Sequence, residues 1–336
     1  MYRNNDFIYD AAVHLEECIA MPVTIESTRV DYDAVLTIKK IQFTVAAKAE
    51  IRTANKGIVL AQLKELETKT SKPIIIIAKF IASNIAQEFK EKAINYLDVA
   101  GNAFIKRDDL FISVAGQKVQ KIEKTNQTRA FQETGIRLIF SLLSNPNNLQ
   151  LSYRELAEQT GIAIGSVSNV IKELEDLKFI LKTDTKRILK NKQELLNRWI
   201  VSYQDVLRPR LLKRRMRFTD KAKYNNWKTL LQNQNDNAIL WGSEPAAALI
   251  TNYLKPAIFS IYTTKSWQEC AKLFEMIPDE NGDIEILTTF WNQENEKNKY
   301  QTVPPILIYT DLINSSNDRN LETAKIILDN ELQNIK

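Results

Sequence analysis

The side chains of this sequence that are best placed for chemistry follow one another along a short segment, residues 164–176. Its polar positions include Ser166, Ser168, Asn169 and Lys172. Asparagine can form two hydrogen bonds to adenine, and lysine can reach the O6 and N7 atoms of guanine. The chemistry expected of this segment is therefore hydrogen bonding to the edges of DNA bases.

An amphipathic helix would present these groups on one side, because apolar residues recur between them at i, i+3, i+4 and i+7: Val167, Val170, Ile171 and Leu174. A second short helical pattern covers residues 153–159 and ends at Thr160-Gly161. A tight glycine turn between two such helices is typical of a helix-turn-helix, in which the second helix reads DNA. Tyr153 and Arg154, at the start of the earlier helix, are included among the predicted DNA contacts.

The flanking segments complete the pattern of a winged helix. Residues 128–145 predict a first helix, whose apolar side carries Ile136, Ile139, Phe140 and Leu143. Residues 178–190 predict two short strands around Thr183-Asp184-Thr185. This wing carries three predicted phosphate contacts, Lys182, Lys186 and Arg187.

The distribution of charge points to the same region. Residues 178–228 hold sixteen Lys and Arg against four Asp and Glu, a net charge of +12, whereas the whole chain carries only +5. Lysine and arginine supply the sequence-independent part of DNA affinity, so a basic block beside a reading helix predicts a phosphate-binding surface. The alternative is a solvated, highly charged helix face.

Residues 1–125 predict a sheet with helices packed on it. Helices are expected at 11–19, 56–68 and 83–92, and strands at 30–38, 41–51, 73–78, 94–99 and 103–107. Residues 191–336 predict a basic helical connector followed by a second α/β domain. Its expected elements are a helical stretch over 194–218 interrupted at Pro209, a strand, helix and strand within 237–263, a helix at 268–276, strands at 283–290 and 304–313, and a last helix at 321–332.

Several classes of enzyme lack the residues they would need. The chain has one histidine, His14, and two distant cysteines, Cys18 and Cys270, so a histidine-rich zinc site or a Ser-His-Asp triad has almost no raw material. Glycines form neither a P-loop nor a GxGxxG motif. We expect no cofactor, no bound metal and no enzymatic activity.

One alternative remains open in the first domain. The stretch FTVAAKAEI (43–51) resembles a strand of restriction-endonuclease-like folds, in which an Asp and an acidic residue two positions before a Lys bind Mg²⁺. Asp33 (or Asp31) and Lys48 stand in suitable places, but the acidic position is Ala46. Glu50 shares the face of Lys48 by strand periodicity and could stand in, giving a Mg²⁺-dependent nuclease with a displaced carboxylate.

Six stretches together resemble bacterial AbiEi-type proteins, the antitoxin and transcriptional regulators of type IV toxin-antitoxin (abortive infection) systems. They are INYLDVAGNAFI, TRAFQETGIRLIFSLL, YRELAEQTGIAIGSVSNVIKEL, RWIVSYQDVLRPRLL, LWGSEPAAALITNYLKP and PPILIYTDLINSSNDRNLETAKII. The resemblance implies a phage-defence regulator whose winged helix binds double-stranded DNA at its own operator and represses its own operon. It also implies a nucleotidyltransferase-like toxin as genetic partner, opposed without direct contact. This sequence differs from the usual pattern in having Ala163 where such helices often begin with Ser or Thr.

The expected fold class is therefore α+β with several domains: a restriction-endonuclease-like α/β domain over 1–125, without activity, a winged helix over 126–190, and the connector with its α/β domain over 191–336. The N-terminus has no apolar signal-peptide region. The longest apolar tract, residues 73–86, is interrupted by Lys79 and is too short to span a bilayer. These features predict a cytoplasmic protein that does not enter a membrane.

Overall fold

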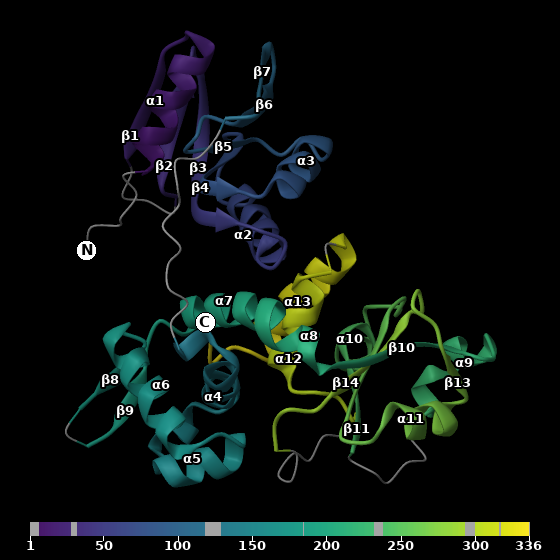
Figure 1. The fold of residues 1–336 in the computed structure, drawn as a ribbon. Helices are drawn as coiled ribbons and strands as arrows, with labels where there is room; N and C mark the ends of the chain where they lie inside the picture. The colour runs from purple at the N-terminus through teal and green to yellow at the C-terminus, as the bar shows by residue number, and fades with distance from the viewer. Residues whose placement is uncertain are drawn as a thin grey trace. The chain divides into compact units, whose positions relative to one another are not determined.

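The computed structural model describes residues 7–27, 32–117, 129–183, 185–231, 238–292, 300–315 and 317–335. The chain forms two compact units, Met1–Thr125 and Asn126–Lys336 (Figure 1). Both units combine helices with sheets, which agrees with the expected α+β class. In the part of the chain that is described, no helix is long and apolar enough to cross a membrane.

The first unit contains a seven-stranded sheet with strands in sequence order, β1 to β7. The central strands β3, β4 and β5 run parallel, and the outer pairs are antiparallel. The elements are α1 (Phe7–Ile19), β1 (Val23–Ser27), β2 (Ala34–Ile38), β3 (Ile41–Ile51), α2 (Lys56–Glu67), β4 (Ile74–Ile81), α3 (Ser83–Glu91), β5 (Tyr96–Asp98), β6 (Ala103–Arg107) and β7 (Leu110–Val114).

Strand alternation decides which residues of this sheet face each helix layer. Phe43 and Val45 of β3 pack with α1 in one apolar core, and successive side chains of a strand point to opposite faces. Lys48 consequently faces the other layer, where its Nζ donates to Gln62 of α2 at 2.6 Å. The helices and strands expected from the sequence are present here within a few residues, but β1 and β7 were not expected.

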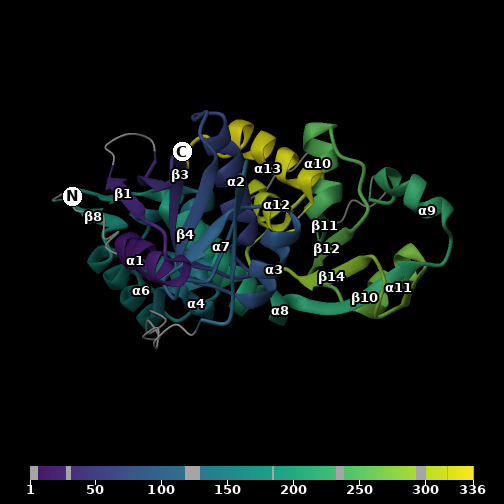
Figure 2. The same cartoon turned by 90° about the horizontal axis from the view of Figure 1, so that it is seen from above.

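The second unit begins with three helices and a hairpin. They are α4 (Glu133–Ser144), α5 (Tyr153–Thr160), α6 (Ile164–Asp176) and the antiparallel strands β8 (Ile180–Lys182) and β9 (Arg187–Leu189), with short 3-10 turns at Arg129–Phe131 and Pro146–Gln150. Figure 2 shows α4, α6 and β8 from above. The order and type of these elements are those expected over residues 128–190.

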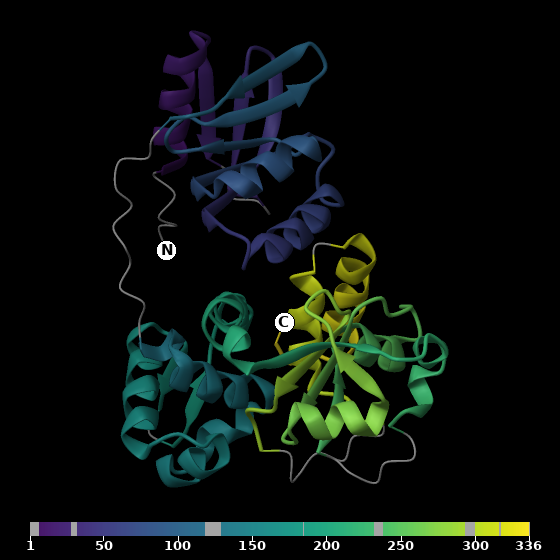
Figure 3. The same cartoon turned by 45° about the vertical axis from the view of Figure 1, so that its right-hand side comes forward.

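The rest of the second unit is built on a five-stranded sheet, in the order β11-β12-β14-β10-β13. Its elements are α7 (Lys192–Ser202), a π-helical turn (Tyr203–Leu207), α8 (Arg208–Leu211), β10 (Leu212–Phe218), α9 (Ala222–Asn225), a 3-10 turn (Trp227–Thr229), β11 (Ile239–Gly242), α10 (Ser243–Thr251), β12 (Phe259–Thr263), α11 (Trp267–Phe274), β13 (Met276–Pro278), β14 (Ile284–Thr288), α12 (Pro305–Ile313) and α13 (Asp318–Asn330). Helices lie on both sides of this sheet (Figure 3).

Two expectations for this region were wrong. Residues 212–218, expected to end a basic helix, form β10, because Met216 and Phe218 alternate with exposed arginines and the strand pairs with both β13 and β14. Residues 304–313, expected as a strand, form α12. A short apolar run does not distinguish a buried strand from a buried helix, and every residue from Ile306 to Ile313 is buried.

Aromatic side chains join the three-helix region to the following elements. Trp199 of α7 stacks on Phe140 of α4, with ring centroids 5.7 Å apart, and on Tyr203, at 4.9 Å. Its indole N–H donates to the carbonyl oxygen of Ile136 at 2.8 Å. Since Phe140 also contacts Phe290, which follows β14, α4 and α7 share one core with the second sheet.

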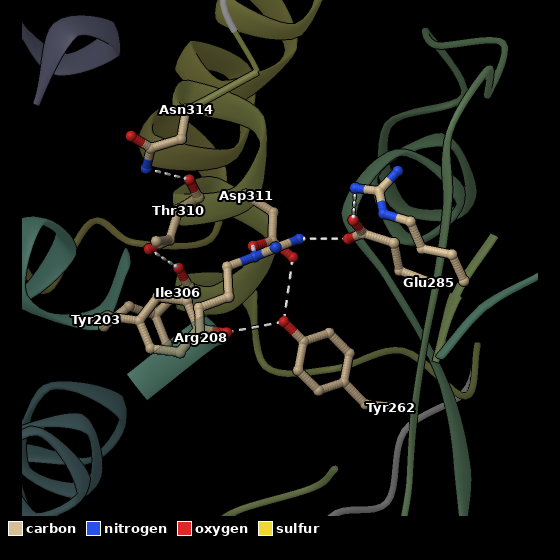
Figure 4. A network of polar contacts seen from close by, with 9 residues as sticks. Tyr203, Arg208, Tyr262, Glu285, Ile306, Thr310, Asp311 and Asn314 are labelled. Atoms are coloured by element: carbon tan, nitrogen blue, oxygen red, sulfur yellow. Dashed lines mark hydrogen bonds and ion pairs between the residues drawn. The ribbon is translucent and has the colours of Figure 1, made fainter. Parts of the chain in front are cut away.

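An ionic network around two buried carboxylates continues from this aromatic contact (Figure 4). The guanidinium of Arg208 donates to Glu285 at 2.7 Å and to Asp311 at 3.1 Å, and Glu285 also pairs with Arg215. The Tyr262 hydroxyl donates to Asp311 at 3.2 Å and lies 2.8 Å from the Tyr203 hydroxyl.

The network is electrostatically costly to bury and depends on its central cation. Burial raises the pKa of Asp311, and the neighbouring Arg208 opposes that shift. Burial also raises the pKa of Tyr203 and of Tyr262, and the charge of Asp311 adds to it. Both phenols are therefore neutral hydrogen-bonding groups, and Arg208 is the cation that compensates the two carboxylates in the interior.

We expect Arg208→Met to lower the free energy of unfolding of the second unit at pH 7 by about 3 to 5 kcal/mol, because it leaves Asp311 and Glu285 without that cation. Arg210→Met is the matched control. Arg210 pairs with Glu133 at 2.6 Å, but its side chain is 64% exposed, so its loss should cost less than about 1 kcal/mol. All five tryptophans lie in the second unit, so their fluorescence during urea unfolding measures it selectively.

The loss of unfolding free energy caused by Arg208→Met should also depend on pH. Burial already raises the pKa of Asp311 against the opposing effect of Arg208, so loss of the arginine should raise it further, and the folded variant should bind protons more readily than the folded wild type. Stability relative to the wild type is then regained as pH falls from 7 toward the ordinary pKa. Equal losses in the two arginine variants, or a deficit that is constant with pH, would contradict this account.

Candidate nucleic-acid interface

The turn between α5 and α6 is fixed by local hydrogen bonds. Ser152 caps α5: its Oγ accepts from the N–H of Glu155 at 3.2 Å, and the Glu155 carboxylate accepts from the N–H of Ser152 at 2.7 Å. Hydrogen bonds from the side chain and the backbone N–H of Ser152 to the carboxylate lower the pKa of Glu155. Gly161 ends the helix with φ of +66°, a conformation that glycine adopts without strain. The chain can therefore reverse into α6 within three residues.

The side of α6 that was expected to be buried is buried. Val167, Val170, Ile171 and Leu174 are each at most 1% exposed. Ala163 occupies the N-cap and makes no side-chain capping bond, because its methyl group has no hydrogen-bond acceptor.

The polar side of α6 is open to solvent. Ser168, Asn169 and Lys172 are exposed, and Ser166 is half-buried. The acidic residues of this helix lie after these positions, in its last turns, where the carboxylate of Glu173 accepts from the N–H of Ala130 at 2.7 Å. Hydrogen-bonding groups and one cation thus occupy the exposed surface of the first half of α6.

The β8–β9 hairpin presents two of the three side chains expected there. Lys182 and Lys186 are exposed. The turn is closed by Thr183, whose N–H and hydroxyl both donate to the carbonyl oxygen of Lys186 at 2.9 Å. Asp184, expected at the tip, lies outside the described residues.

Arg187 has a different environment from the two lysines. Its guanidinium donates to the carbonyl oxygen of Leu151 at 2.8 Å and lies 5.2 Å from the ring centroid of Tyr153. The backbone N–H of Arg187 donates to the side-chain oxygen of Gln150 at 3.3 Å. Arg187 and Tyr153 are both half-buried, whereas Arg154 is exposed. Arg187 therefore ties the hairpin to the start of α5.

The basic block of residues 178–228 does not form a single basic surface. Its second half is largely neutralised within the fold: besides Arg208, Arg210 and Arg215, Arg217 pairs with Asp279 and Lys223 with Glu275. In its first half, the exposed lysines are Lys178, Lys182, Lys186 and Lys190. None of these four lysines forms a side-chain ion pair with a residue that the structure describes. The net charge of +12 consequently overstates the positive surface, of which the four hairpin lysines are one part and Arg214, Lys221 and Lys228 another.

Some residues that shape this region were not singled out from the sequence. Lys178 and Lys190 flank the hairpin strands and add exposed positive charge beside them. Their position at the two ends of the expected wing could have identified them from the sequence. Ile164, the first residue of α6, is 48% exposed. Its apolar side chain gave no reason to expect it at a surface.

The alternative site in the first unit has only part of its expected geometry. Asp33 accepts from the N–H of Ala47 at 2.8 Å. Burial lowers the pKa of Lys48, and the charge of Asp33 opposes the shift, so these two residues do interact. Glu50, however, pairs with Arg52 at 3.0 Å. Asp31 lies outside the described residues, and among those described no group of three or more His, Cys, Asp or Glu could hold a metal ion.

Comparison with known proteins gives one result. A family described as transcriptional regulator, AbiEi antitoxin, type IV TA system, matches residues 187–333. No curated protein and no solved structure matches the chain. The matched residues begin at β9 and include the whole Arg208 network. The resemblance to the AbiEi antitoxins, transcriptional regulators of type IV toxin-antitoxin systems, is therefore confirmed over residues 187–333.

Proposed function

We propose that α4, α5, α6 and the β8–β9 hairpin form a winged helix that binds double-stranded DNA, and that the chain uses it to repress its own toxin-antitoxin operon. The observation that carries this proposal is the two-sided character of α6. One side is fully buried, while Ser168, Asn169 and Lys172 are exposed beside a lysine-bearing hairpin.

The two parts of this surface have different roles in the proposal. A helix that enters the major groove reads base edges through its exposed polar residues. Lys182 and Lys186 contact phosphates, which adds affinity for any sequence. Arg187 and Tyr153 act indirectly, because their mutual contact holds the hairpin against α5. Arg154 is exposed at the start of α5 and is assigned to the DNA backbone.

The family match over residues 187–333, to antitoxins and transcriptional regulators, supports the regulatory role. We further propose that the genetic partner is a nucleotidyltransferase-like toxin, and that the antitoxin opposes its effect without binding it. The ligand of the winged helix is then the operator upstream of the chain's own gene.

The proposal gives the first unit no catalytic role. A hard Mg²⁺ ion needs oxygen ligands, and Ala46 supplies none from its side chain. Glu50 lies four residues further along β3, about 13 Å by strand rise, and its carboxylate pairs with Arg52. One carboxylate, Asp33, beside the ammonium group of Lys48 is a poor metal site.

We therefore expect the chain to leave single- and double-stranded DNA intact in the presence of Mg²⁺ or Mn²⁺. Gel electrophoresis of end-labelled DNA measures this directly. Metal-dependent cleavage that disappears in both Asp33→Ala and Lys48→Ala would establish the nuclease instead.

The hairpin is tested by the dependence of DNA affinity on salt. Replacing both Lys182 and Lys186 by Ala should weaken binding to every sequence. It should also reduce the magnitude of the slope of log K against log salt by roughly one unit per lost phosphate contact. Lys79→Ala in the first unit is the control and should leave the slope unchanged. If the double variant keeps the wild-type slope, the hairpin lies outside the interface.

Base recognition by α6 is tested at Asn169. Asn169→Ala should reduce the preference for the operator over random DNA by about 1 to 3 kcal/mol, because a bidentate contact to one base is lost. Affinity for random DNA should change little, since Asn169 carries no charge. Equal losses on both DNAs, measured by fluorescence anisotropy, would show that Asn169 only orients the helix.

A further inference from the structure

The start of α6 presents an uncharged and largely apolar surface. Ala163, Ile164 and Gly165 follow one another there, and all three are exposed. Ile164 is 48% exposed, whereas the apolar residues on the next turns of the same helix are at most 1% exposed. Between residues 129 and 190, the large apolar side chains exposed among those described are Ile164 and Leu181 of the hairpin.

Helix geometry directs the Ile164 side chain away from the core. The Cα–Cβ bonds of a helix tilt toward its N-terminus, so the side chain of the first residue leans past the start of the helix. Ile164 continues the apolar stripe of Val167 and Ile171 by one turn, beyond the region that α4 and α5 cover.

The neighbouring backbone is accessible from the same end. Apart from its chain neighbours and the backbone of its own helix, a Cβ atom added at Gly165 would meet no atom within 4 Å. A bulky partner can therefore approach the first turn of α6 closely. The first turn contains no acidic residue, and exposed Asn169 and Lys172 follow it. The partner that suits this surface carries an apolar group close to hydrogen-bonding edges and negative charge.

The major groove of DNA offers that combination. Thymine places its C5-methyl group there, beside the hydrogen-bonding edges of the bases, and the first residues of a reading helix lie closest to them. We infer that Ile164 contacts the C5-methyl group of a thymine in the operator and makes the protein select thymine at that position. This inference rests on the proposed function and names one specificity-determining contact within it.

Replacing thymine by uracil removes only the methyl group, because both bases pair with adenine. The probe is a synthetic duplex of the upstream segment that the chain protects in footprinting, prepared with thymidine or with deoxyuridine at every thymidine position. Wild-type protein should bind the deoxyuridine duplex about fourfold more weakly for the methyl that Ile164 contacts. Ile164→Ala should bind the thymidine duplex more weakly than wild type and should lose that fourfold part of the discrimination.

Leu181→Ala is the matched control, because Leu181 is an equally exposed aliphatic residue (49%) on the hairpin. It should retain the full discrimination between the two duplexes. Unchanged circular dichroism and melting temperature confirm folding of both variants, as the exposure of the two side chains leads us to expect.

The outcomes separate the inference from the proposed function. If wild-type protein binds both duplexes specifically and equally, or if Ile164→Ala keeps the wild-type ratio, the Ile164 contact is refuted while DNA recognition stands. If wild-type protein binds no DNA specifically, the proposed function fails and the inference fails with it.

Discussion

The second unit depends on one half-buried cation, the guanidinium of Arg208, which pairs with two buried carboxylates. It lies between the carboxylates of Glu285 on β14 and Asp311 on α12, so it joins the sheet, a helix of the C-terminal region and the short helix that begins at Arg208 itself. Glu285 also pairs with Arg215, and Asp311 also accepts a hydrogen bond from Tyr262. An unpaired buried charge is far more costly than an exposed one. Arg208 thereby ties the segment between α7 and β10 to β14 and α12.

This constraint extends to the candidate DNA-binding elements through aromatic contacts. Tyr203 bonds to Tyr262 of the network and stacks on Trp199, which stacks in turn on Phe140 of α4. Helix α6 packs on α4 through its buried side. A chain of packed side chains therefore connects α6 to the second sheet. Hydrogen bonding to DNA bases benefits from side chains held in place by packing, because a loosely held side chain loses conformational entropy when it binds.

The sequence predicted the three helices and the hairpin well, because each has a local signal. The spacing from Val167 to Leu174 indicates a buried face, and Gly161 indicates the turn before it. The same reasoning failed for residues 304–313, since an apolar run carries no period when all sides are buried. It also missed the strand at 212–218, whose arginines suggested an exposed helix although two of the three form ion pairs within the fold.

Charge was the least reliable guide to the candidate site. Counting basic residues over 178–228 cannot show that Arg208 pairs with Glu285 and Asp311 or that Arg187 bonds to Leu151, because these partners are distant in sequence or are backbone atoms. The exposure of Ile164 was equally hidden, since it depends on where the core ends and not on the helix period. Local patterns thus predict elements, whereas the surface that they present depends on tertiary partners.

The central claim is that α6 reads a specific DNA sequence, and nuclease footprinting of the full chain on the region upstream of its own gene tests it most directly. The account predicts a bounded protected segment that is lost when Ser168, Asn169 and Lys172 are replaced together by Ala, while the variant unfolds at the same urea concentration as the wild type. A protected segment that persists in this triple variant, or no protection by the wild type, would contradict it.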